Sequence, residues 1–184
     1  MSLGRLASAL VEGGQAFRRD LDVVRQRNGR AQSRAPLLAA CTDIGALALG
    51  LLRTSIVLRR ATGRSWGTRG LLRWVFHIDV STDEIGSGLA LPHPFNIVIG
   101  SGVSLGADCT LMHNTTLEHA QCTQIGDRVV LGTGCVVLAE RRIGSDAMCG
   151  ANSVVTRDVP ERAVVVGAPA HVVRFVGEEG RRAA

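Results

Sequence analysis

Residues 99–153 read IGSGVSLGADCTLMHNTTLEHAQCTQIGDRVVLGTGCVVLAERRIGSDAMCGANS. In this stretch an aliphatic side chain returns at every sixth position, apart from one step of eight. A period of six matches neither the 3.6-residue period of an α-helix nor the two-residue alternation of a simple strand. The rest of the chain is organised around this repeat. Its members are Ile99, Leu105, Leu111, Leu117, Ile125, Leu131, Val137 and Ile143, continued by Cys149 and Val155.

Six residues suffice for one short strand and one corner, where glycine or a small residue permits the tight turn. Three hexads close one coil of about 18 residues. Stacked coils lie about 4.8 Å apart, so each coil can satisfy the backbone groups of its neighbour. The repeat therefore predicts a mainly β protein, with a parallel β-helix over residues 77–174. We expect an α-helical region for subunit packing at 1–76 and a flexible tail at 175–184.

Helical periodicity marks the N-terminal region. Apolar residues recur at spacings of three, four and seven over residues 3–24, which predicts an amphipathic helix that Gly13-Gly14 interrupts and Asn28-Gly29 ends. Residues 68–76 are expected to form a last short helix or a linker.

A second helix is predicted to start with Ser33 as its cap and Pro36 in its first turn, and to run to about Leu58. Its segment 36–52 is strongly apolar, with only Asp43 charged. This segment is shorter than the roughly 20 residues that cross a bilayer. Burial between subunits is therefore predicted, and contact with a membrane is not expected.

Composition excludes several kinds of chemistry. All 21 basic residues are arginine and there is no tyrosine, so a Schiff-base lysine, a phosphate-binding lysine and a tyrosine acid or base are excluded. The five cysteines form no Cys-x-x-Cys pair, and Cys109, Cys135 and Cys149 occupy inward positions of the repeat. Free thiols in a reducing cytoplasm are expected, and no secretion signal opens the chain.

Charge is unevenly distributed between the two halves of the chain. Residues 1–75 carry 13 arginines against four acids, whereas the remainder carries 8 arginines against 12 acids. A basic half can indicate nucleic acid or an anionic membrane. Here the arginines are scattered along helical patterns without interleaved aromatic residues, so solvated helix faces are predicted and no nucleic-acid partner is expected.

The repeat skips twice. Leu91 to Ile99 is a step of eight, and the extra residues fall in Pro92-His93-Pro94-Phe95-Asn96. The second skip, between Leu117 and Ile125, contains Glu118, His119 and Cys122. Irregular positions in a regular scaffold often carry function. A histidine framed by two prolines is therefore the first candidate for chemistry.

Two stretches carry a resemblance to a known family. Residues 149–170, CGANSVVTRDVPERAVVVGAPA, resemble the terminal coil of the hexapeptide-repeat acyltransferases. Residues 85–100, IGSGLALPHPFNIVIG, resemble the segment around the catalytic histidine of the serine O-acetyltransferase branch. The resemblance implies a left-handed winding. It also implies an acetyl-CoA-dependent O-acetyltransferase acting on a small hydroxyl acceptor, with L-serine as the first expectation.

The same resemblance assigns His93 as the general base and Asp79 as the carboxylate that orients it. An imidazole with a pKa near 6.5 is suited to take a proton from an alcohol at neutral pH. The interval from Val80 to Ile85 is one residue shorter than in the family, so contact between Asp79 and His93 stays open. A bulge-capping histidine and a corner aspartate are the structural alternatives.

In that family the pantetheine arm of acetyl-CoA lies outside the prism, between neighbouring subunits, on backbone groups of successive coils. The resemblance places these groups at Gly132, Thr133, Gly150 and Ala151, with Arg157 at a CoA phosphate. A shared site implies a homotrimer, or a hexamer built as a dimer of trimers. Transfer would be direct, with a backbone N–H at the oxyanion.

The acceptor is less defined. Serine acetyltransferases carry a long glycine-rich loop with a further histidine after the hexad near Leu117, but this chain has only residues 118–124 there. His113 and His119 are predicted to line the acceptor pocket. A sugar or polysaccharide hydroxyl stays open as an alternative to serine.

Two other classes fit the fold. A γ-type carbonic anhydrase would hold zinc with His93, His113 and His119. The six-residue interval places the last two on successive faces, so no metal is expected. The other class is a non-catalytic scaffold, against which the Pro-His-Pro bulge argues.

Overall fold

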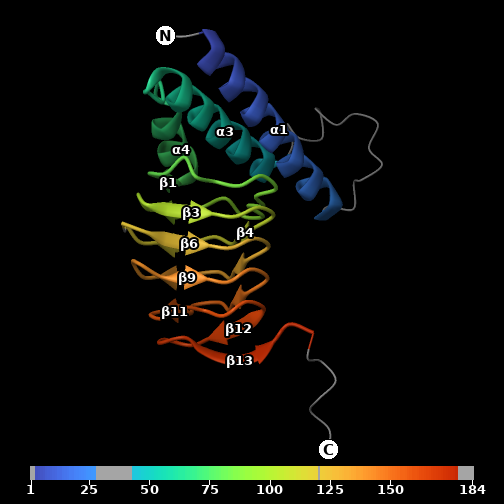
Figure 1. Ribbon diagram of the computed structural model, residues 1–184, viewed down its shortest axis with the longest axis vertical. Coiled ribbons are helices and arrows are strands. Elements are labelled where there is room, and N and C mark those ends of the chain that lie inside the picture. Colours follow the sequence, from blue (N-terminus) through green and yellow to red (C-terminus); the bar gives the residue numbers. More distant parts are fainter. Residues whose placement is uncertain (1–2, 28–42, 120, 178–184) are drawn as a thin grey trace, which may run out of the picture.

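The computed structural model describes residues 3–27, 43–119 and 121–177. Three helices lie over one end of a stack of β coils, and the C-terminal strands close the other end (Figure 1). The helix signals predicted at Asn28-Gly29, Ser33 and Pro36 lie outside the described residues. The same is true of Cys41 and of residues 178–184 of the predicted tail.

The first helix, α1, spans Leu3–Arg27 and passes through Gly13-Gly14 without a break, so the predicted interruption is wrong. A glycine inside a helix costs only about 1 kcal/mol, which packing can offset. A Cβ on Gly13 would overlap the side chain of Val57 in helix α3, which spans Ile44–Thr62. The glycine therefore lets the two helices approach closely.

Helix α3 begins later than the sequence predicted, with Asp43 as its N-cap. The Asp43 carboxylate accepts a hydrogen bond from the Ala46 N–H at 3.0 Å, which satisfies one of the free donors of the first turn. The helix ends at Gly63, whose positive φ of 75° suits glycine. Helix α4, Thr68–Phe76, matches the predicted range. None of the described helices combines the length and the apolarity that a bilayer crossing needs.

The β region is a prism with three faces, whose strands pair in parallel except for the antiparallel β13. Face 1 contains β1 (Asp79–Val80), β2 (Val98–Ile99), β5 (Thr116–Leu117), β8 (Val136–Val137) and β11 (Val154–Val155). Face 2 contains β3 (Val103–Leu105), β6 (Thr123–Ile125) and β9 (Arg142–Ile143). Face 3 contains β4 (Thr110–Leu111), β7 (Val130–Leu131), β10 (Met148–Cys149), β12 (Ala163–Val166) and β13 (His171–Phe175).

Strand register confirms the predicted coil. Val98 pairs with Thr116, eighteen residues later, and Val136 pairs with Val154 at the same interval. Thr116 pairs with Val136, twenty residues later, because that coil contains the second skip. The residues of the six-residue series are buried inside the prism, none exposed by more than 4%. The extra residues of each skip therefore lie in a turn and do not disturb the stacked strands.

The first coil has no coil above it, and arginines of the helices cover its open edge. Arg53 donates to the carbonyls of Ile85 and Gly86 at 2.8 and 2.6 Å. Arg60 and Arg69 donate to the carbonyls of residues 83 and 82 at 2.9 and 3.0 Å. The prediction of solvated arginine faces is wrong for Arg53 and Arg69, which are 5% and 19% exposed, because unpaired backbone groups at a sheet edge need donors. Arg60 stays 43% exposed, as predicted.

A buried ion pair fastens α1 and α3 to this edge. Arg53 contacts Asp20 through two hydrogen bonds of 2.7 and 2.9 Å, and the Asp20 side chain is fully buried. The carboxylate also accepts the Leu89 N–H at 2.9 Å. At the opposite end β13 pairs antiparallel with β12.

Candidate active site

One corner of the prism collects most of the predicted site residues. This corner, between face 3 and face 1, consists of turns 92–97, 112–115, 132–135 and 150–153. Ala90 lies opposite Thr110, and face 3 keeps its register through the coils below. His93, His113, Thr133 and Ala151 therefore occupy equivalent places in four successive coils. We name these four residues the corner column.

The two histidines of the column touch. Their ring centroids are 5.7 Å apart and the planes meet at 79°, an edge-to-face contact. The His93 side chain is exposed, so the imidazole can meet a ligand in solution. His113 is partly buried: its Nδ1 is sealed from solvent and has no hydrogen-bond partner in the described chain.

Helix α4 holds the bulge that carries His93. The Phe95 ring lies against Phe76 with centroids 6.1 Å apart, and the Asn96 N–H donates to the Phe76 carbonyl at 3.2 Å. Pro94 is buried, and the Phe95 N–H donates to the His93 carbonyl at 2.8 Å. The backbone beneath the imidazole is therefore anchored on both sides.

Asp79 lies at the top of face 1, where its carboxylate pairs with Arg73 of α4 at 2.6 Å. This contact raises the pKa of Arg73 through a hydrogen bond and through charge attraction. Among the described residues no hydrogen bond joins Asp79 to His93. Asp79 pairs with Val98 nineteen residues later, so the first coil is one residue shorter than the other coils that contain a skip. Arg73 was not identified from the sequence.

Three of the four column residues have backbone N–H groups that are free. Within the described chain, the N–H groups of His113, Thr133 and Ala151 donate to no protein acceptor. The N–H groups of Gly132 and Gly134 are instead used between coils, at 2.8 and 3.0 Å. The column thus offers an unpaired backbone donor at each of its lower three residues, at a spacing of about 4.8 Å.

Glycine is required beside these donors. A Cβ on Gly132 would lie 2.8 Å from the backbone nitrogen of Ala151 in the next coil. A Cβ on Gly150 would lie 2.7 Å from a methyl group of Val166. The structure therefore brings the predicted backbone positions for CoA together on one corner.

Besides Asp79, two predicted site residues lie away from this corner. His119 is at the corner between faces 1 and 2, where its Nδ1 accepts the Ser101 N–H at 3.1 Å. Arg157 is exposed at the same corner, in the turn after β11. A ligand on the corner column could reach groups of this kind only from another chain. No cluster of three or more potential metal ligands occurs in the part of the chain that the structure describes.

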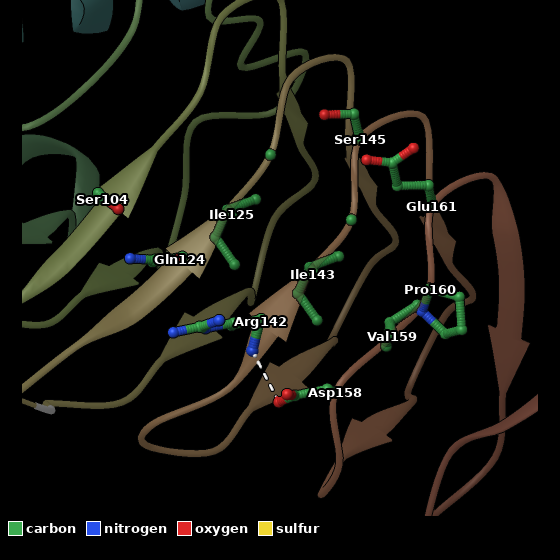
Figure 2. Close-up of a pocket in the computed structure, with 12 residues that line it drawn as sticks. Ser104, Gln124, Ile125, Arg142, Ile143, Ser145, Asp158, Val159, Pro160 and Glu161 are labelled. Carbon is green, nitrogen blue, oxygen red and sulfur yellow. Dashed lines mark hydrogen bonds between the residues drawn. The ribbon is translucent and has the colours of Figure 1, made fainter.

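Figure 2 shows a hollow on face 2, away from the corner column. It is lined by polar side chains such as Gln124, Arg142 and Glu161, and the Arg142 N–H donates to Asp158 at 3.0 Å. None of the predicted site residues lines it. The column itself stands on a corner of the prism.

The outward side chains differ between the faces. On face 1, Val98, Val136 and Val154 alternate with buried neighbours and point outward, and on face 3 Val130 and Met148 do the same. Face 2 has polar residues at the equivalent places: Ser104, Gln124 and Arg142. Face 1 also has Asp79 and Thr116 at the equivalent places, and face 3 has Thr110. Faces 1 and 3, which meet at the corner column, are therefore more apolar than face 2.

The cysteines of the described residues offer no activated nucleophile. Burial raises the pKa of the Cys109 thiol to about 11. A hydrogen bond to Cys135, together with burial, raises the pKa of Cys149. The same hydrogen bond lowers the pKa of Cys135, but this thiol is fully buried and cannot meet a substrate. Cys122 is the exposed thiol among the described cysteines, and its sulfur accepts a hydrogen bond from Gln124 at 3.5 Å. Catalysis through a covalent thiol intermediate has no support in these surroundings.

The six-residue coils define a hexapeptide-repeat protein. A serine acetyltransferase of Helicobacter pylori (strain J99) is 31% identical over 160 residues, which cover 83% of this chain and 94% of that relative. The chain belongs to the serine acetyltransferase family.

Other comparisons agree with this placement. A Mycobacterium tuberculosis serine acetyltransferase is 39% identical over 95 residues, which cover 48% of this chain and only 42% of that relative. The crystal structure of Neisseria gonorrhoeae serine acetyltransferase in complex with serine superposes with a TM-score of 0.77 at 27% identity, covering 91% of this chain and 72% of that one. No family model matches the chain.

Proposed function

We propose that this protein transfers an acetyl group from acetyl-CoA to the hydroxyl of L-serine, with His93 as the general base. The observation that carries the proposal is the corner column, in which an exposed imidazole stands in line with unpaired backbone donors. Family membership supports the reaction, and the serine bound to the Neisseria enzyme supports the acceptor.

The mechanism follows from the order of groups along the column. Unpaired N–H groups at Thr133 and Ala151 bind the amide carbonyls of the pantetheine arm, and Gly132 and Gly150 allow close packing of the backbone beside these donors. His93 takes the proton of the acceptor hydroxyl, and the alkoxide attacks the thioester carbonyl. The free N–H of His113 is a donor for the oxyanion that forms.

Asp79 has a secondary place in this proposal. Its carboxylate is engaged by Arg73, so it can orient His93 only after that exposed ion pair opens. A sugar hydroxyl is the second candidate acceptor, because the loop at residues 118–124 is shorter than the glycine-rich loop that serine acetyltransferases carry at this place. His119 is the residue proposed to contact the acceptor.

We extend the proposal to a homotrimer in the cytoplasm. A corner encloses a ligand only when another chain supplies the opposite wall, and His119 and Arg157 stand on the corner that a neighbour could present. The apolar outward residues of faces 1 and 3 support subunit contacts there, whereas polar face 2 suits solvent. The described cysteines are all free thiols, which supports a reducing compartment. A dimer of trimers through the helices is the larger assembly to test.

Thiol release from acetyl-CoA tests the reaction, with serine, homoserine and sugars as acceptors. His93→Ala should lower turnover by at least about a hundredfold with the fold intact. His77→Asn is a matched control, because His77 is exposed outside the column and asparagine tolerates its positive φ of 53°. Full activity of His93→Ala would reject the assigned base.

Light scattering tests the assembly. Val136→Glu places a charge on face 1 and should give monomers with little activity, whereas Gln124→Glu on face 2 should stay trimeric. An active wild-type monomer would contradict the shared site.

A further inference from the structure

The imidazole of His113 is the unused group of the corner column. It lies one coil below His93, and its Nδ1 is buried without a partner in the described residues, whereas its Nε2 is not sealed from solvent. A neutral imidazole carries one hydrogen, and on Nε2 that hydrogen faces a ligand on the corner. Asn114, the next residue, is already bound to Asn96 at 3.1 Å.

Distances along the column place a particular atom of the donor beside His113. Coils repeat about every 4.8 Å. The two amides of pantetheine are separated by two methylenes, so they match consecutive coils when bonds of about 1.5 Å are extended. With these amides at Ala151 and Thr133, two further methylenes carry the sulfur about 4 Å onward, to the level of His113. The carbonyl carbon then lies between the two histidines.

We propose that His113 donates a hydrogen bond from Nε2 to the thioester sulfur as the carbon–sulfur bond breaks. This inference rests on the proposed function and gives His113 a role in the leaving group, not in the acceptor pocket. His93 takes the hydroxyl proton, the serine oxygen bonds to the acetyl carbon, and the sulfur leaves with its electron pair. The proton on His93 then neutralises the thiolate, so both imidazoles end neutral.

Two variants test this role. His113→Leu removes the donor, and we expect kcat with acetyl-CoA to fall by about tenfold or more, with the KM for serine unchanged. His113→Gln keeps an N–H donor and should recover part of the loss. Circular dichroism and light scattering verify the fold of both variants. If His113→Leu does not fold, His113→Gln still tests the role of His113.

Each outcome has a separate meaning. A raised KM for the acceptor at unchanged kcat would place His113 in the acceptor pocket and overturn the inference, as would unchanged kinetics of both variants. A folded wild-type protein that releases no thiol with any acceptor would instead reject the proposed function. If His93→Ala loses activity and His113→Leu keeps full activity, the proposed function is supported and the role of His113 is refuted.

Discussion

The buried pair of Asp20 and Arg53 gives the sharpest test of how this fold is held. Arg53 is 5% exposed and Asp20 is not exposed at all, and together they make five hydrogen bonds that join α1, α3 and the first coil. Asp20→Ala leaves a buried guanidinium without a counter-ion, which costs about 3–5 kcal/mol. That is a large part of a typical stability of about 5–15 kcal/mol.

The assay is thermal unfolding by circular dichroism at fixed protein concentration. For a chain of this length, the loss predicts a midpoint lower by about 6–20 °C. Arg19→Ala is the matched control, because Arg19 also makes a two-bond contact with an aspartate, Asp108, but its side chain is 54% exposed. Exposed pairs contribute little, so this variant should unfold near the wild-type midpoint.

A double variant separates charge from backbone pairing. Replacing both partners by apolar residues, in Asp20→Leu with Arg53→Met, removes the lone charge but leaves the Ile85 and Gly86 carbonyls and the Leu89 N–H without donors or acceptors. Each unpaired buried group costs about 1–3 kcal/mol, so the double variant should stay well below wild type. Wild-type stability of the double variant, or equal midpoints for Asp20→Ala and Arg19→Ala, would refute the reasoning.

Three further expectations concern other parts of the chain. Burial holds the pKa of Cys109 at about 11 against 9.0 for a free thiol, so stability should be full below pH 9 and fall as pH rises toward 11. Denaturation midpoints measured across this pH range should fall less in Cys109→Ala than in the wild-type protein. Gly13→Ala should lower the melting temperature by forcing α1 from α3, whereas Gly14→Ala, with open space around it, should not; equal effects would contradict the packing argument. Asp79→Asn should reduce kcat less than His93→Ala in the thiol-release assay, because Asp79 pairs with another group; an equal loss would show that the carboxylate acts on the base.

Two charged residues lie on apolar helix faces, and their positions in the sequence could have predicted that they are buried. Asp20 follows Phe17 by three positions and precedes Val24 by four, so it falls on the buried stripe of α1. Arg53 similarly stands beside Leu49 and Leu52 in α3. Charges at such positions predict burial, but which charge pairs with which depends on how the helices cross.

Arg73 offered no comparable signal. It is one of many arginines in the basic half, and nothing in its local spacing indicates that it holds Asp79. The pairing arises because α4 ends beside the first strand of the prism, a relation that depends on the turn at His77. Contacts of this kind follow from the placement of elements, so local patterns do not contain them.

Periodicity by itself determined the β-helix, its coil length and the two places where a coil is longer, because each hexad repeats one local rule about inward side chains and turns. It also placed His93 at an irregular turn. Tertiary structure alone decided that His93 and His113 touch, that Asp79 is held by Arg73 and that the arginines of the helices cover the open edge. The physical reason is that a coil's strands need only their own six-residue pattern, whereas an end without a neighbouring coil must find its hydrogen-bond partners in distant parts of the chain.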